Sequence, residues 1–307
     1  MRVAVTGAFG YSGQYIARRL IAGGHDVLTL TNSPFRANPF GDKVRSVPFH
    51  FDQPDLLAQS LRGVEALVNT YWVRFNHRLF TFAQAVANTR VLFDAAKRAG
   101  VRRVVHVSIT NPDPRSDLPY FSGKARVEAH LQSLGLSYCI LRPAVLFGRE
   151  DILINNIAWM LRHFPVFGLF GSGDYQLQPI FVDDLAAAAV QKAAETQNEI
   201  IQAIGPETFT FRNLVAAISK TLGLNRPIIR VPPAIGYAST RLLGLLLRDI
   251  IITRDEIRGL MENRLCVDAP PLGQTRLTDW ITQNKETLGR RYANELRRRL
   301  PPQPLVP

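Results

Sequence analysis

The sequence predicts an α/β fold built on a doubly wound, parallel β-sheet. Short apolar segments typical of buried strands alternate with amphipathic segments typical of helices along residues 1–150. Glycines follow several of the predicted helices, where the chain can leave in the left-handed conformation. A glycine-rich turn also joins the first strand to the first helix. This alternation calls for helices on both faces of the sheet and for ligand binding along the edge where the strands end.

The individual elements follow from the same patterns. The expected strands are Val3–Thr6, Asp26–Thr31, Val44–Phe51, Ala66–Tyr71, Arg103–Ile109 and Tyr138–Leu146. The expected helices between them are Tyr11–Ala22, Leu56–Leu61, Phe82–Ala99 and Gly123–Leu134. The later pattern is less regular, with helices at Asp151–His163, Asp183–Ala194 and Phe211–Leu222, a loop at Pro165–Gly173 and a strand at Ile200–Ile204. We expect a Rossmann-type domain over residues 1–150, completed by roughly 180–205, and a smaller interleaved C-terminal α/β region over residues 151–307.

The composition is that of an ordinary folded protein. The 307 residues are 46% hydrophobic and 20% charged, and neither a membrane span nor a signal peptide is expected. Cys139 and Cys266 lack metal-ligand spacing, so we expect reduced thiols, no metal site and a cytoplasmic location. The net charge of +12 suits an anionic cofactor, an acidic substrate, a membrane surface or nucleic acid. Because no nucleic-acid-binding motif is present, no nucleic-acid partner is expected.

Three glycines follow the first predicted strand with the spacing G-x-x-G-x-x-G. At these positions Gly7 would form the tight turn, Gly10 would let the backbone approach a pyrophosphate, and Gly13 would let the helix pack against the strand. The N-terminus of the helix would then face the anion. A merely glycine-rich turn is the alternative, but it does not account for three glycines at this spacing after the first strand. The motif therefore predicts a dinucleotide site.

Residues after the second and third strands bear on which dinucleotide binds. Sites that select NAD usually carry Asp or Glu at the end of the second strand, to bind the ribose 2′-hydroxyl. Here Asn32 lies in that region and no acid is present, which removes the repulsion of a 2′-phosphate. Arg36 is either a positive partner for that phosphate or an exposed loop arginine. Asp52 either reaches the adenine or is a helix cap or loop aspartate. We therefore expect NADP(H) in preference to NAD(H).

A serine, a tyrosine and a lysine follow the fifth strand in an order that suits proton transfer. Ser108 lies at the ligand-binding edge, while Tyr120 and Lys124 are four residues apart at the start of a helix and share one face. A neighbouring ammonium lowers the pKa of a phenol, which lets tyrosine act as a general acid or base. Ser108 would hold the substrate oxygen. The alternative is a chance spacing, since the three prolines between Asn111 and Pro119 could shift the tyrosine.

Together these features resemble the short-chain dehydrogenase/reductase superfamily, in particular its extended and atypical branch of NAD-dependent epimerase/dehydratase-like proteins. Within that branch, relatives of the nucleotide-binding accessory subunit of respiratory complex I look most similar. The segments that carry the resemblance are Thr6–Gly13, Asn88 through Asn111, Tyr120–Glu128, Leu141–Gly148 and Gln178–Ala186.

The resemblance implies roles for individual residues. Tyr120 matches the proton-transferring tyrosine, Lys124 the lysine that also contacts the nicotinamide ribose, and Ser108 the substrate-orienting hydroxyl. Arg142 falls near the nicotinamide, and Asp183 belongs to a structural motif. The implied activity is an NADP(H)-dependent oxidoreductase, or an epimerase/dehydratase using its cofactor transiently, that acts on a small molecule. Because the branch also includes cofactor-binding proteins without known turnover, a structural, assembly or regulatory protein that docks a partner is the alternative.

Residues 231–252 are rich in leucine and isoleucine and are interrupted by Arg241. A core helix or a lid is the ordinary explanation for such a segment. The alternative is an amphipathic surface, helped by the positive charge, that contacts a membrane or a protein complex.

Overall fold

A parallel sheet organises the first of two compact units, which comprises residues 1–143 and 182–203. The computed structural model describes residues 1–33, 37–77 and 80–299. The strands of this sheet are β1 (Arg2–Thr6), β2 (Asp26–Leu30), β3 (Val44–Val47), β4 (Ala66–Asn69), β5 (Arg103–Val107), β6 (Ser137–Pro143) and β11 (Glu199–Ala203). They lie in the order β11-β6-β5-β4-β1-β2-β3, and each neighbouring pair is parallel. This is the strand order of a doubly wound dinucleotide-binding fold, so the predicted fold class is confirmed.

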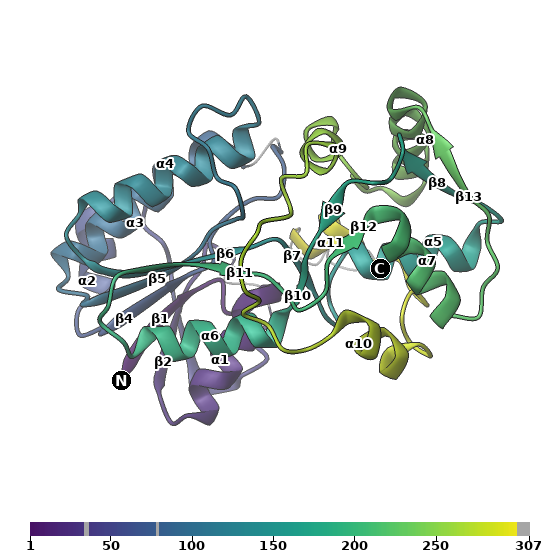
Figure 1. The fold of residues 1–307 in the computed structure, drawn as a ribbon. Coiled ribbons are helices and arrows are strands. Elements are labelled where there is room, and N and C mark those ends of the chain that lie inside the picture. Colours follow the sequence, from purple (N-terminus) through teal and green to yellow (C-terminus); the bar gives the residue numbers. More distant parts are fainter. Residues whose placement is uncertain (34–36, 78–79, 300–307) are drawn as a thin grey trace, which may run out of the picture. The chain divides into compact units, whose positions relative to one another are not determined.

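Helices cover both faces of this sheet (Figure 1). On one face α1 (Tyr11–Ala22) packs beside α6 (Val182–Ala193). On the other, α3 (Phe82–Arg98) lies between α2 (Pro54–Ser60) and α4 (Pro119–Ser133), and a short 3-10 helix, η1, spans Gly41–Lys43. The central strands are therefore apolar on both faces, as the sequence predicted, and bury side chains such as Val5, Leu67 and Val105 completely.

Several strand and helix boundaries differ from those predicted, and a proline accounts for two of the differences. The expected strand Tyr138–Leu146 is divided, because β6 ends at Pro143 and β7 (Val145–Phe147) pairs with β10 (Pro179–Phe181) in a separate sheet. Proline lacks the amide hydrogen needed to continue a strand ladder, which fits a break at this residue. Helix α4 begins at Pro119 rather than Gly123, since proline at the first helical position sacrifices no hydrogen bond.

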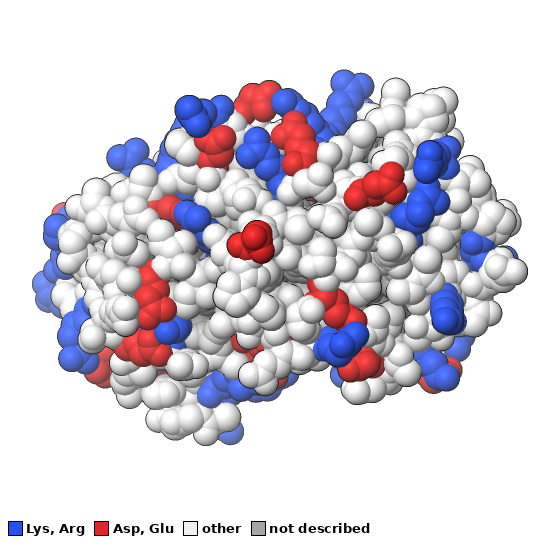
Figure 2. All heavy atoms as spheres, in the orientation of Figure 1, with Lys and Arg blue, Asp and Glu red and all other residues white. Residues whose placement is uncertain are grey.

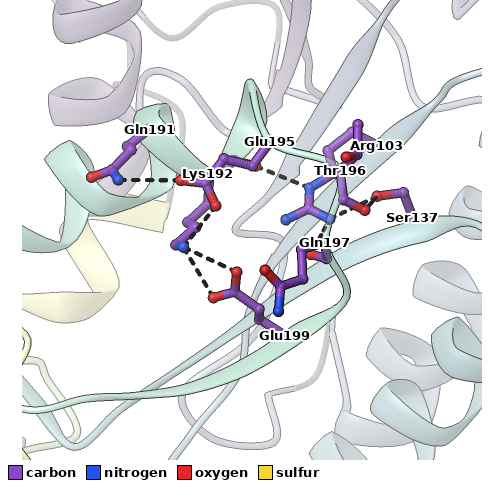
Figure 3. A network of polar contacts seen from close by, with 8 residues as sticks. All are labelled: Arg103, Ser137, Gln191, Lys192, Glu195, Thr196, Gln197 and Glu199. Atoms are coloured by element: carbon purple, nitrogen blue, oxygen red, sulfur yellow. Dashed lines mark hydrogen bonds and ion pairs between the residues drawn. The ribbon is translucent and has the colours of Figure 1, made fainter.

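A buried arginine ties the α6–β11 segment to the rest of the first unit, at the sheet edge where the strands begin (Figure 3). The Arg103 guanidinium donates to the carbonyl oxygens of Lys192 and Gln197 at 2.9 and 2.8 Å, and to the hydroxyl of Ser137 at 2.7 Å. Lys192 forms ion pairs with Glu195 and Glu199 at 2.7 and 3.0 Å. These contacts hold residues far apart in sequence in one unit, opposite the edge where ligands bind in this fold.

The second unit comprises residues 144–181 and 204–307. Its strands form two-stranded sheets, β10 with β7, β12 (Phe209–Thr210) with β9 (Gln176–Leu177), and β13 (Ile228–Val231) with β8 (Phe167–Phe170). Its helices are α5 (Leu153–His163), α7 (Phe211–Thr221), α8 (Pro233–Leu247), α9 (Arg254–Met261), α10 (Leu277–Asn284) and α11 (Glu295–Arg299). A separate apolar core, which includes Phe147, Leu214 and Trp280, is formed by residues of α5, α7, α9 and α10 and of strands β7, β8 and β9.

The loop predicted at Pro165–Gly173 is wrong, because it contains strand β8. This strand pairs with β13, about sixty positions later in the chain, so its partner lies outside any local pattern. In the described part of the chain, no helix is both long enough and apolar enough to cross a membrane.

Candidate functional site

The glycine turn follows the carboxyl end of β1 and is tight. Gly7 has a φ of +68°, a conformation that glycine adopts without strain, and its amide donates to the carbonyl of Leu30 at 3.1 Å. Gly10 donates to the carbonyl of Gly7 at 2.7 Å and precedes the first residue of α1. A Cβ atom on Gly13 would lie 2.1 Å from the Gly7 carbonyl oxygen, so only glycine allows this approach of helix to turn.

This turn fits the pyrophosphate of a dinucleotide. The first amides of a helix have no intrahelical acceptor, and here the first turn of α1 contains no acidic residue. Hydrogen-bond donors and the positive end of the helix dipole therefore face the edge of the sheet where the strands end. Gly7, Gly10 and Gly13 could hold the diphosphate through backbone alone.

The other residues predicted to bind the cofactor lie in different settings. Asn32 is exposed just beyond β2, and its Oδ1 accepts a hydrogen bond from the amide of Phe49 at 3.0 Å. Its side-chain oxygen is thereby occupied and its amide group is left to donate. Asp52 is exposed in a turn, and Gln53 rather than Asp52 occupies the N-cap position of α2. Arg36 lies outside the described residues.

Ser108 is a buried hydroxyl at the carboxyl end of β5. The residue is 3% exposed, and its amide donates to the carbonyl of Leu141 at 2.7 Å. Within the described chain its Oγ has no hydrogen-bond partner. Burying an unpaired hydroxyl costs about 1–3 kcal/mol, which a ligand oxygen could offset.

Lys124 lies on α4, almost fully buried at 2% exposure. Its Nζ donates to the carbonyl of Val107, the residue before Ser108, at 2.7 Å, and lies 4.4 Å from the centre of the Trp72 ring. Burial lowers the pKa of this ammonium to about 7, although the carboxylate of Glu128 raises it. Glu128 is in turn paired with Arg142 of β6 at 2.5 Å, so the arginine expected near the nicotinamide is held by α4.

Tyr120 lies one helical turn before Lys124, in the first turn of α4. The residue is half-buried, and its ring packs edge-on against Trp72 and Phe82, with centroids 5.9 and 5.7 Å away. Trp72 therefore contacts both Tyr120 and the ammonium of Lys124. Gly123 leaves room for this indole, because a Cβ there would lie 3.2 Å from it.

A polar network across the strand ends was not predicted from the sequence. Asn69 of β4 accepts a hydrogen bond from the Thr6 hydroxyl at 2.9 Å and from the Tyr71 amide at 3.1 Å. Its Oδ1 is therefore the acceptor, and its Nδ2 donates to Nδ1 of His106 at 3.0 Å. Burial, together with the charge on Lys124, lowers the pKa of His106 well below its usual value, so the ring is neutral. The sequence feature that could have indicated this network is the presence of the polar residues Asn69 and His106 within otherwise apolar strands.

Asp183, expected from the resemblance to be structural, joins two helices. Its carboxylate accepts two hydrogen bonds from the guanidinium of Arg19, both at 2.7 Å. This bidentate pair links α6 to α1 on one face of the sheet. Among the described residues, no cluster of three or more His, Cys, Asp or Glu side chains could hold a metal ion.

Curated proteins similar to this chain include subunits of mitochondrial NADH dehydrogenase. The chain is 26% identical over 261 residues to the NADH-ubiquinone oxidoreductase 40 kDa subunit of Neurospora crassa, covering 82% of this chain and 68% of that protein. It is 28% identical over 224 residues to NADH dehydrogenase (ubiquinone) 1 alpha subcomplex subunit 9 of Arabidopsis thaliana, covering 68% of this chain and 55% of that protein. Both relatives are named as mitochondrial, which contradicts the predicted cytoplasmic location.

A comparison with solved structures finds the same fold in an NADPH-dependent quinone oxidoreductase from Escherichia coli complexed with NADPH. The two structures superpose with a TM-score of 0.76 at 22% sequence identity, covering 92% of this chain and 99% of the reductase.

A comparison with protein families matches residues 3–204, which contain the glycine turn, Ser108, Tyr120 and Lys124. The matched family is described as the NAD dependent epimerase/dehydratase family. The resemblance deduced from the motifs is thereby confirmed, and the chain belongs to this family.

Proposed function

We propose that the protein is an NADP(H)-dependent oxidoreductase that reduces or forms a carbonyl group by means of Ser108, Tyr120 and Lys124. The observation that carries this proposal is the buried hydroxyl of Ser108, which has no partner in the described chain and follows directly the carbonyl that anchors Lys124. An unpaired buried hydroxyl beside a buried ammonium is costly for the fold. It is expected where a substrate oxygen supplies the missing hydrogen bond.

Each residue has a separate task in this proposal. The nicotinamide, when bound, supplies or accepts the hydride. Ser108 donates a hydrogen bond that orients the substrate oxygen, and the Tyr120 hydroxyl gives that oxygen a proton or removes one. Lys124 holds a positive charge beside Tyr120 on the same face of α4, and its pKa of about 7 keeps the charge adjustable near neutrality. Trp72 packs against both side chains and limits their movement.

A preference for NADP(H) rests on the end of β2. No carboxylate is present there, and the hydrogen bond from Phe49 turns the Asn32 side chain so that its amide group donates. A hydrogen-bond donor suits the 2′-phosphate of NADP(H). The ribose hydroxyls of NAD(H) are instead usually bound by a carboxylate acceptor. Asp52, exposed after β3, would lie toward the adenine.

Quinones are the first substrates to test. Within the first unit, Tyr120 packs against three aromatic side chains, those of Trp72, Phe82 and Phe121. Flat aromatic carbonyl compounds suit such surroundings. The similar fold of a quinone oxidoreductase supports the same choice.

A second candidate is a cofactor-binding protein without turnover that docks a partner complex. The observation that favours it is the similarity to NADH dehydrogenase subunits over 68–82% of this chain. In such a protein the dinucleotide would stabilise the fold and would exchange slowly.

Nicotinamide fluorescence and steady-state turnover separate the two candidates. An enzyme should bind NADPH more tightly than NADH, release it readily and oxidise it in the presence of a quinone. Tyr120→Phe should then reduce turnover by at least about 100-fold and leave NADPH affinity unchanged, since general acid catalysis contributes roughly 10²–10⁴-fold. The matched control is Tyr138→Phe, which removes a hydroxyl near the start of β6, at the edge of the sheet away from the carboxyl ends of the strands. Tight NADPH binding with negligible exchange and no turnover would support the second candidate, and failure to bind either dinucleotide would refute both.

A further inference from the structure

Helix α8 in the second unit carries an apolar face that no described residue covers. Ile235, Leu242, Leu245 and Leu246 are 58%, 65%, 71% and 76% exposed, the largest values among the large hydrophobic residues of the described chain. They recur at helical spacing and lie on one side of the helix with Ala238, which is also exposed. The outer face of a surface helix is normally polar, so this face requires another explanation.

The opposite face of α8 is the one that packs within the second unit. A Cβ on Gly236 would lie 2.7 Å from the Phe170 ring of β8, and one on Gly244 would lie 2.6 Å from the carbonyl oxygen of Asp249. These glycines allow a close approach to the unit's interior. Because this inner face fixes the helix, the exposed leucines are not needed to hold it in place.

The charges on α8 itself and directly at its two ends are positive. Helix α8 contains no acidic residue, and Arg241 on the helix, with Arg230 before it and Arg248 at its end, is exposed. Arg248 has a φ of +51°, in the left-handed region where glycine is usual at a helix end. The next acid, Asp249, is buried and accepts hydrogen bonds from the Tyr292 hydroxyl and two backbone amides. Figure 2 shows uncharged surface over the position of α8 with basic side chains beside it.

We propose that α8 lies on an anionic lipid surface, with its four exposed aliphatic side chains in the apolar layer. Arg241 of the helix and the flanking Arg230 and Arg248 would lie at the phosphate headgroups. Helices with this distribution of leucine and arginine bind in the plane of the membrane interface. At 15 residues the helix is too short to span a bilayer, for which about 20 are needed. The charge of the arginines complements that of the lipid phosphates.

The chemistry of this face favours lipid over a protein partner. Protein interfaces concentrate aromatic residues and form directional hydrogen bonds. The exposed face of α8 is aliphatic instead, and the hydroxyls of Ser239 and Thr240 bond to carbonyls of their own helix at 3.0 and 2.9 Å. A fluid apolar layer needs no such directional contacts.

Co-sedimentation of the full chain with vesicles tests this proposal. The protein should bind vesicles of phosphatidylcholine with 30 mol% phosphatidylglycerol far more tightly than pure phosphatidylcholine vesicles, and high salt should weaken the binding. Leu242→Gln/Leu245→Gln/Leu246→Gln should lower the partition coefficient at least tenfold. Arg241→Gln and Arg248→Gly should each lower it about fivefold, since each arginine near an anionic surface contributes about 1 kcal/mol. The control Leu56→Gln changes a 38% exposed leucine on α2 and should have no effect.

Thermal unfolding identifies any variant that fails to fold, and in that case the single variant Leu246→Gln provides the test. Absence of binding to the anionic vesicles, or binding that the leucine substitutions leave unchanged, would overturn the proposal. A dimer that the leucine variants convert to a monomer, together with no vesicle binding, would show that a second copy of the chain covers α8.

Discussion

Replacement of Lys124 by methionine should stabilise the protein while removing its proposed activity. The ammonium is 2% exposed, and burial lowers its pKa from 10.5 to about 7. That difference corresponds to roughly 5 kcal/mol by which the folded environment disfavours the charged form. Methionine keeps the aliphatic chain, and loss of the hydrogen bond to Val107 costs about 1 kcal/mol. Lys124→Met should therefore raise the free energy of unfolding by a few kcal/mol at pH 6–7.

The pH dependence identifies the source of this gain. Between about pH 7 and 10.5 the folded state binds fewer protons than the unfolded state, because the pKa of Lys124 is lower in the folded state. The stability of the wild type therefore rises with pH in this window, by up to about 1.4 kcal/mol per pH unit from this one group. Below pH 7 both states are protonated and the full penalty remains. The advantage of the variant should thus be largest near pH 6 and shrink as the pH rises toward 10.

Urea denaturation of the wild type and Lys124→Met at pH 6, 7, 8, 9 and 10 measures the difference between their free energies of unfolding. The titration of groups that both proteins contain cancels in this difference. Lys192→Met is the matched control, since the ion pairs of Lys192 with Glu195 and Glu199 raise its pKa. The stabilisation from these ion pairs is present at neutral pH and is lost only as the pH rises beyond 10.5. Lys192→Met should therefore be slightly less stable than the wild type, by an amount that does not change between pH 7 and 9. A Lys124→Met protein that is less stable than the wild type at pH 6, or equally stable at every pH, would refute the argument.

Three further predictions concern packing and buried polar groups. Gly13→Ala should abolish NADPH binding and lower the melting temperature, because the new Cβ atom must move by about 0.9 Å to reach a 3.0 Å contact with the Gly7 carbonyl oxygen. The control Gly24→Ala has open space around the new Cβ atom and a φ of +72°. It should lower the free energy of unfolding by about 1 kcal/mol and leave the affinity for NADPH unchanged. Arg103→Met should destabilise by about 3 kcal/mol in urea denaturation, because it leaves two backbone carbonyls without their donor, and a loss below 1 kcal/mol would contradict this. Tyr175→Phe removes a buried hydroxyl that has no partner in the described chain, so unfolding measurements should find the stability unchanged or raised by about 1 kcal/mol, and not lowered.

Much of the first unit could be predicted because its signals are local. The helix at Tyr11–Ala22 has the predicted bounds, since an apolar period and two following glycines specify it within one short segment. Strand β8 was missed for the opposite reason, because pairing with β13 depends on residues distant in the sequence. The dual contact of Trp72 with Tyr120 and Lys124 was likewise invisible, since loop residues carry no periodic pattern.

By itself the sequence determined the order of strands and helices in the first unit, the glycine turn, the family and the i, i+4 relation of Tyr120 to Lys124. Each of these depends on residue spacing along the chain, which backbone geometry translates directly into position. Only the tertiary structure decided the state of the proposed catalytic groups. The lowered pKa of Lys124 and the unpaired hydroxyl of Ser108 arise from burial among β5, α4 and the Trp72 loop. Burial and hydrogen bonding depend on neighbours brought together from distant parts of the chain, so spacing alone does not contain them.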